Sequence, residues 1–177
     1  MLRITFLLCV LVWFGCDSAR NVQYKELSAL REKIMEDNIN GLTGPAQRSL
    51  WMDFSSKAMA FYRAYPTDSS APSLLFNAAE LYFKANEADS ALMAVGILDS
   101  FPQFSRKPDL LYLRGQIHQM LFLDYDKAEQ YFSQLVQEYP NHPASASAIT
   151  SLAVLKTLNE VEADSLEFTA DSLPYQP

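Results

Sequence analysis

The chain has few of the residues that enzymes and metal proteins use for their chemistry. Its 177 residues include two cysteines, two histidines and five glycines. His118 and His142 share no metal-ligand spacing with each other or with a cysteine, and Asp124 and Asp126 fit a turn and helix N-cap better than a calcium loop. There is no glycine-rich dinucleotide motif, phosphate-binding loop or nucleophile elbow. We therefore expect no metal and no cofactor, and an enzyme is the least favoured class.

Basic residues are also scarce. The 14 Lys and Arg stand against 21 Asp and Glu, which gives a formal charge of −7. Proteins that bind nucleic acid need a basic face, so we expect no nucleic-acid partner. The same balance argues against electrostatic attraction to anionic lipid. Apolar residues make up 49% of the chain, which is enough to build a core without disulfides.

The one long apolar run lies at the N-terminus. Arg3 precedes it, residues 4–14 are almost all apolar, and Gly15 and Cys16 end it. A basic residue, an apolar run and a small residue are typical of a secretory signal. The run is shorter than the roughly 20 apolar residues that span a bilayer. It resembles a bacterial lipoprotein signal, in which the cysteine becomes the lipidated first residue of the mature chain.

This resemblance implies a signal peptide at residues 1–15, lipidation at Cys16 and attachment to a membrane through acyl chains. We expect residues 16–23 to form a short polar tether. The alternatives are a plain signal peptide, or an uncleaved anchor in which Cys16 plays no part. In the favoured case Cys9 leaves with the signal, so no thiol remains for a disulfide or a nucleophile.

Two stretches of the chain match each other at a fixed offset of 37 residues. Four positions show the match: Leu74 with Leu111, Ala78 with Gly115, Ala91 with Ala128, and Leu98 with Leu135. A repeat of this length predicts stacked supersecondary units rather than one irregular globule. It also favours binding over catalysis.

Prolines and apolar spacing place the predicted helices. Pro72, Pro108 and Pro143 each fit the first turn of a helix, while Pro102 and Pro140 end their units. No segment alternates apolar and polar residues over a strand's length, so we expect no sheet. The helices are predicted at 24–37, 46–64, 73–85, 88–100, 108–122, 125–138 and 143–158.

The unit at 108–140 resembles the tetratricopeptide repeat through Gly115, Ala128, Phe132 and Pro140. The small residues let the two helices of the repeat approach each other, and the phenylalanine fills the space beside them. The resemblance implies an all-α fold, a short right-handed solenoid of helical hairpins. The expected parts are a degenerate helix pair at 24–66, repeats within 72–158 (72–102, 108–140 and a partial one at 143–168), and a disordered tail at 169–177.

In this family a concave groove is lined by the first helix of each repeat. Carried over by register, the lining residues here are Leu75, Ala79, Tyr82, Tyr112, Gln116 and Gln119. Aromatic and amide side chains suit the recognition of a peptide. The alternative is that Leu75, Tyr82 and Phe83 pack against the neighbouring repeat. His118 falls at a position that packs inside the repeat, and we interpret it as structural.

The sequence therefore predicts a lipid-anchored interaction scaffold of the bacterial cell envelope, with a protein or peptide partner and no enzymatic activity. The resemblance favours an exported, periplasm-facing protein, on the outer rather than the inner membrane. A second hypothesis is a dedicated structural subunit of one envelope complex, with no open groove.

Overall fold

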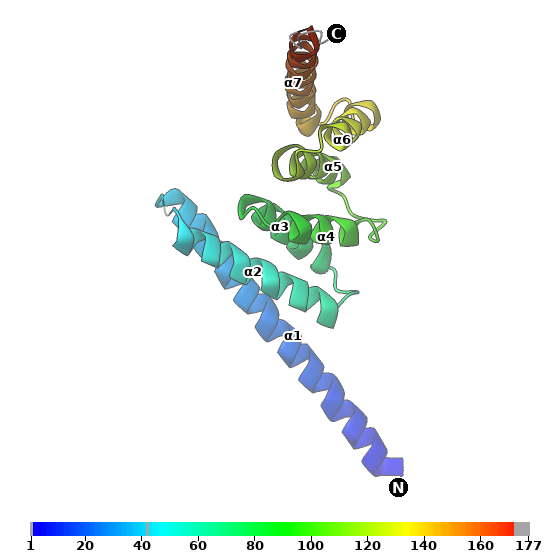
Figure 1. Ribbon diagram of the computed structural model, residues 1–177. Coiled ribbons are helices and arrows are strands. Elements are labelled where there is room, and N and C mark those ends of the chain that lie inside the picture. Colours follow the sequence, from blue (N-terminus) through cyan, green and yellow to red (C-terminus); the bar gives the residue numbers. More distant parts are fainter. Residues whose placement is uncertain (1, 42, 172–177) are drawn as a thin grey trace, which may run out of the picture. The chain divides into compact units, whose positions relative to one another are not determined.

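The computed structural model describes the backbone of residues 2–41 and 43–171, and the side chains of residues 18–38, 40–41 and 43–158. Seven α-helices and one π-helical turn account for most of this part of the chain, which contains no strand (Figure 1). The prediction of an all-α fold of helical repeats is confirmed. The chain divides into two compact units, Met1–Phe104 and Ser105–Pro177.

The first unit contains α1 (Leu2–Ile39), α2 (Pro45–Ala64), α3 (Ala71–Lys84) and α4 (Ala88–Leu98). Helices adjacent in sequence pack against each other, so α3 has α2 on one side and α4 on another (Figure 1). The largest buried side chains of this unit are Leu27, Phe54, Phe61, Leu75, Phe76, Val95 and Leu98. Prolines lie in the first turns of α2 and α3, where a missing N–H costs no helical hydrogen bond.

The second unit contains α5 (Lys107–Ile117), the π-turn η1 (His118–Phe122), α6 (Tyr125–Glu138) and α7 (Pro143–Asp171). Helix α6 packs on both α5 and α7. Its apolar stripe of Ala128, Phe132 and Leu135 forms a core with Ala148 and Leu155 of α7. The helices predicted at 46–64, 73–85, 88–100 and 125–138 are present, with ends shifted by two residues or fewer.

Two predicted breaks are wrong. Residues 16–23 were expected to be a tether, but α1 continues through them. The first helix of the partial third repeat was expected to end at residue 158, but α7 runs without interruption to Asp171. Neither stretch contains the glycine or proline that would stop a helix after residue 15 or after Pro143.

Two further predictions fall partly or wholly outside the described residues. The side chains of the predicted signal peptide and of Cys16 are not among them, although the backbone there is helical from residue 2. Of the predicted tail at 169–177, residues 169–171 belong to α7, and the rest lies outside the described part. Within that part, no helix combines the length and the apolar character needed to cross a bilayer.

Candidate functional site

The three groove residues predicted on α3 are buried. Leu75 and Ala79 are fully covered, and Tyr82 is 6% exposed. Helix α3 is covered from more than one side because α2 and α4 both pack on it. Burial raises the pKa of the Tyr82 phenol, and the nearby charge of Arg63 on α2 partly opposes this rise. These three side chains are therefore covered and offer no surface to a partner. Their burial agrees with the alternative hypothesis, in which Leu75 and Tyr82 pack against neighbouring helices.

The three groove residues predicted on α5 differ from one another. The Tyr112 ring packs on Phe132 of α6, with 5.6 Å between ring centroids, and it borders the core of the second unit. The Tyr112 ring therefore faces the second helix of its repeat. The repeat register had instead placed it in a groove, pointing away from that helix. Gln116 and Gln119 are half-buried and keep part of their side chains accessible. The assignment of all six residues to one partner groove stays a prediction.

Gly115 lies where α5 packs closely against α6. A Cβ atom placed on it would lie 2.4 Å from Cε1 of Phe132, far inside van der Waals contact. The prediction that this glycine lets the helices approach each other is confirmed, with Phe132 as the residue it faces. Ala128, which we also expected at the approach, is fully buried.

The turn between α5 and α6 has an unusual backbone. Residues His118–Phe122 form the π-turn η1, and Leu123 follows with φ of 54°, in the left-handed region that side chains other than glycine and asparagine seldom adopt. The N–H of Asp124 donates to the His118 carbonyl over 2.9 Å and closes the turn. We call Met120, Leu121, Phe122 and Leu123 the apolar tip.

Most of the apolar tip is exposed, although three of its four residues lie within the helix that we predicted at 108–122. Met120 is 59% exposed, Phe122 41% and Leu123 65%. The signal in the sequence was a run of four apolar residues immediately before Asp124, three of them at the end of the helix predicted at 108–122. We did not recognise this run as an exposed surface, because an apolar run within a predicted helix is ordinarily assigned to the core.

His118 lies beneath this turn. It is 7% exposed, its ring stacks on Tyr131 at 5.5 Å, and its Nδ1 has no hydrogen-bond partner among the described residues. Burial lowers its pKa, although the Asp124 carboxylate, 3.8 Å from Nδ1, acts in the opposite direction. The prediction that His118 packs inside the repeat is confirmed, and its structural role stays an interpretation.

Asp124 acts mainly on the start of α6. As predicted it is the N-cap, accepting a hydrogen bond from the backbone N–H of Lys127 over 3.2 Å. The Lys127 ammonium lies 2.6 Å from the same carboxylate. These hydrogen bonds from Lys127, the side-chain one above all, lower the pKa of Asp124.

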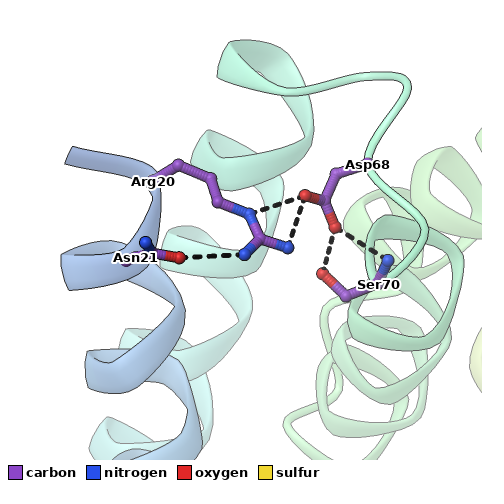
Figure 2. Close-up of polar contacts among 4 residues, drawn as sticks. All are labelled: Arg20, Asn21, Asp68 and Ser70. Atoms are coloured by element: carbon purple, nitrogen blue, oxygen red, sulfur yellow. Dashed lines mark hydrogen bonds and ion pairs between the residues drawn. The ribbon is translucent and has the colours of Figure 1, made fainter. Parts of the chain in front are cut away.

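A second polar cluster joins α1 to the turn between α2 and α3 (Figure 2). Arg20 contacts Asp68 through Nε and Nη2, each 2.7 Å from Oδ2. Ser70 donates its N–H and its hydroxyl to the other oxygen, Oδ1. Burial works to raise the pKa of Asp68, but the hydrogen bonds from Ser70 and Arg20 prevail and lower it. We call this ion pair the Arg20 clasp.

The Arg20 clasp borders an open depression of about 530 Å³ between α1 and residues 64–69. The depression is shallow and its two charged groups already neutralise each other, so we assign the cluster to fastening α1 rather than to binding a ligand. Within the described residues, no group of three or more His, Cys, Asp or Glu side chains is placed to hold a metal ion.

Comparison with protein families places part of the second unit in a known family model. Residues 109–142 match the model of the tetratricopeptide repeat, a span that covers most of α5, all of η1 and α6, and the turn that follows. This is the hairpin whose residues carried the resemblance in the sequence. The family is typically a module for protein–protein interaction. A comparison with curated proteins found no match.

Proposed function

We propose that this tetratricopeptide-repeat protein is a lipid-anchored scaffold that holds a partner protein in the bacterial cell envelope. The observation that carries the proposal is the repeat at residues 109–142, because repeats of this kind commonly bind protein partners. Gln116 and Gln119 on its first helix are partly exposed, and amide side chains of this kind suit a contact with a peptide backbone.

The anchoring part of the proposal rests on the apolar run that ends at Gly15 and Cys16. Acyl chains supply about 0.8 kcal/mol for each buried CH₂ group, so attachment needs no help from charge. That matters here because the chain carries a formal charge of −7 and would be repelled by anionic lipid. We propose a periplasm-facing position and favour the outer membrane.

A second candidate is a dedicated structural subunit with no open groove. The burial of Leu75, Ala79 and Tyr82 favours it, since half of the predicted groove lies inside the first unit. The two candidates differ in whether Gln116 and Gln119 contribute to partner binding.

Anchoring is tested by Cys16→Ser, with Cys9→Ser as the matched control inside the apolar run. We expect the wild-type protein and the control to mature to an acylated chain that begins at Cys16 and fractionates with membranes. The Cys16→Ser variant should stay unprocessed or leave the membrane fraction. An intact mass that shows an unmodified Cys16 in the mature protein would contradict lipidation.

Partner binding is tested by replacing Gln116 and Gln119 with alanine together. The control replaces two exposed glutamines of α6, Gln130 and Gln137, in the same way. Each neutral hydrogen bond contributes about 0.5–1.5 kcal/mol, so the first pair should weaken capture of a partner by about tenfold. The measurement is crosslinking in native membranes followed by mass spectrometry. Equal capture by both variants would favour the dedicated subunit.

A further inference from the structure

The apolar tip differs from its counterpart in the other hairpin. At an offset of 37 residues, Leu123 corresponds to Asn86, and the two share a left-handed backbone with φ of 54° and 60°. Asparagine tolerates this conformation through local hydrogen bonding, whereas leucine does not. The second hairpin therefore keeps an unfavourable residue at a position where the first has a suitable one.

The neighbouring position shows the same contrast. Phe122 corresponds to Ala85, which is 3% exposed, whereas the phenylalanine is 41% exposed. A ring is too large for the place that an alanine fills, so it lies partly in solvent. Together with Leu123 and Met120 it forms an exposed apolar surface on a single turn. These residues combine an unfavourable backbone conformation at Leu123 with a large apolar exposure.

The charges that follow the tip are mostly acidic. Asp124, Asp126 and Glu129 lie in the cap and first turns of α6, where Lys127 is the one cation, so residues 124–129 carry a formal charge of −2. The Lys127 ammonium is held by Asp124. On the preceding helix, the Arg114 guanidinium lies 5.1 Å from the centre of the Tyr131 ring. The apolar tip thus has an acidic rim.

We propose that the apolar tip is a docking surface for a partner protein that presents an apolar pocket with a basic rim. This inference rests on the proposed scaffold function and names a surface for it outside the predicted groove. Charge selects the occupant. An acidic rim is repelled by an anionic membrane surface, and two copies of the tip would bring like charges together. A pocket lined by apolar side chains and edged by Lys or Arg matches both features of the tip.

The test uses the full chain in native membranes, with the photo-crosslinker p-benzoylphenylalanine in place of Phe122. The matched control carries it in place of Asn86, in the corresponding turn of the other hairpin. We expect a protein adduct from the first position and none from the second. The crosslinked partner peptide should lie among apolar residues flanked by Lys or Arg. Adducts with lipid, adducts with a second copy of the chain, or equal adducts from both positions would overturn the proposal.

A second variant separates docking from a structural role. Leu123→Asn introduces the residue that the other hairpin has at this position, so the melting temperature should rise while the adduct at Phe122 falls by about tenfold or more. The double change Asp126→Lys and Glu129→Lys should also weaken the adduct without unfolding the chain. A lower melting temperature in Leu123→Asn would show that the leucine serves the fold.

These outcomes are distinct from a failure of the proposed function. A tip adduct that persists while Cys16→Ser still fractionates with membranes would remove the lipid anchor and keep the docking surface. A tip adduct unaffected by the Gln116 and Gln119 changes would remove the groove alone. An absent tip adduct in a protein whose partner is still captured through Gln116 and Gln119 would remove the docking surface alone.

Discussion

Hairpin α5–α6 brings its helices together with Gly115 against Phe132, whereas hairpin α3–α4 has Ala78 and Val95 at the equivalent positions, both fully buried. The first pair combines no side chain with a large one, and the second combines a small side chain with a medium one. The repeat pattern therefore specifies the combined volume between the helices rather than the identity of either residue. Each residue is suitable only in the presence of its partner.

The same two hairpins differ in how far their first helices are covered. Ala79 on α3 and Gln116 on α5 occupy equivalent positions, but the alanine is fully buried and the glutamine is half-buried. Helix α3 lies between two neighbours in its own unit, which covers the face that the repeat register assigns to a groove. Equivalent positions in two repeats can therefore differ in exposure, because the neighbouring helices decide whether a side chain is covered.

The largest expected effect comes from exchanging these two residue types. Ala79→Gln forces a longer side chain into a filled site, at about 1–3 kcal/mol, and buries an amide without partners, at about 1–3 kcal/mol more. We expect the free energy of unfolding to fall by about 3 kcal/mol or more, as measured by urea denaturation of the full chain. The reverse change, Gln116→Ala, should stay within about 0.5 kcal/mol. Similar losses in both variants would show that the two faces are equally covered.

An intermediate effect is expected where the helices of α5–α6 meet. Gly115→Ala should destabilise the chain by about 1–3 kcal/mol, because its new methyl group meets the Phe132 ring. In the Phe132→Val background, the same change recreates the pair found in α3–α4 and should be neutral or stabilising, since alanine favours a helix by up to about 1 kcal/mol. A double-mutant cycle measures this coupling. Strictly additive effects would contradict compensation between the two positions.

The smallest effect depends on pH and concerns His118, which corresponds to Leu81 in the other hairpin. Because burial lowers the pKa of His118, the folded chain binds its proton less readily than the unfolded chain does. Stability is therefore full above the ordinary histidine pKa of about 6.5 and declines as the pH falls through that value towards the lowered one. His118→Leu should be nearly neutral at high pH and should remove this decline, because leucine needs no partner for a ring nitrogen.

Melting temperatures between about pH 7.5 and pH 5.5 provide the measurement. His142→Gln is the control, because His142 lies in the turn before α7 and should leave the decline intact. An identical pH dependence in the wild-type protein and the His118→Leu variant would show that His118 is not its source.

Much of the fold could be predicted because its signals are local. Prolines in the first turns fix where helices begin. Gly115 predicts that another helix packs closely against α5, whichever helix that is. The orientation of Tyr112 could not be predicted from the sequence. Tyr112 and its neighbour Leu111 both pack against the core around Phe132, so the repeat pattern does not decide which of the two faces the groove. The burial of Tyr82 depends on the packing of α2 against α3. The sequence of α3 alone does not show that α2 packs there. We predicted the end of α7 from the length of the other repeats. The chain has no glycine or proline between Pro143 and Asp171, and the helix continues to that point.

The continuity of α1 sets how far a lipid on Cys16 could lie from the folded body. Arg20 lies four positions further along the helix, a rise of about 6 Å along the axis. A flexible segment of eight residues, by contrast, would let its ends separate by about 15 Å in any direction. The Arg20 clasp then holds that helix against residue 68. If Cys16 is acylated, this short rigid helix would hold the first unit at a small, fixed distance from the bilayer. A partner could then reach the first unit only close to the headgroups.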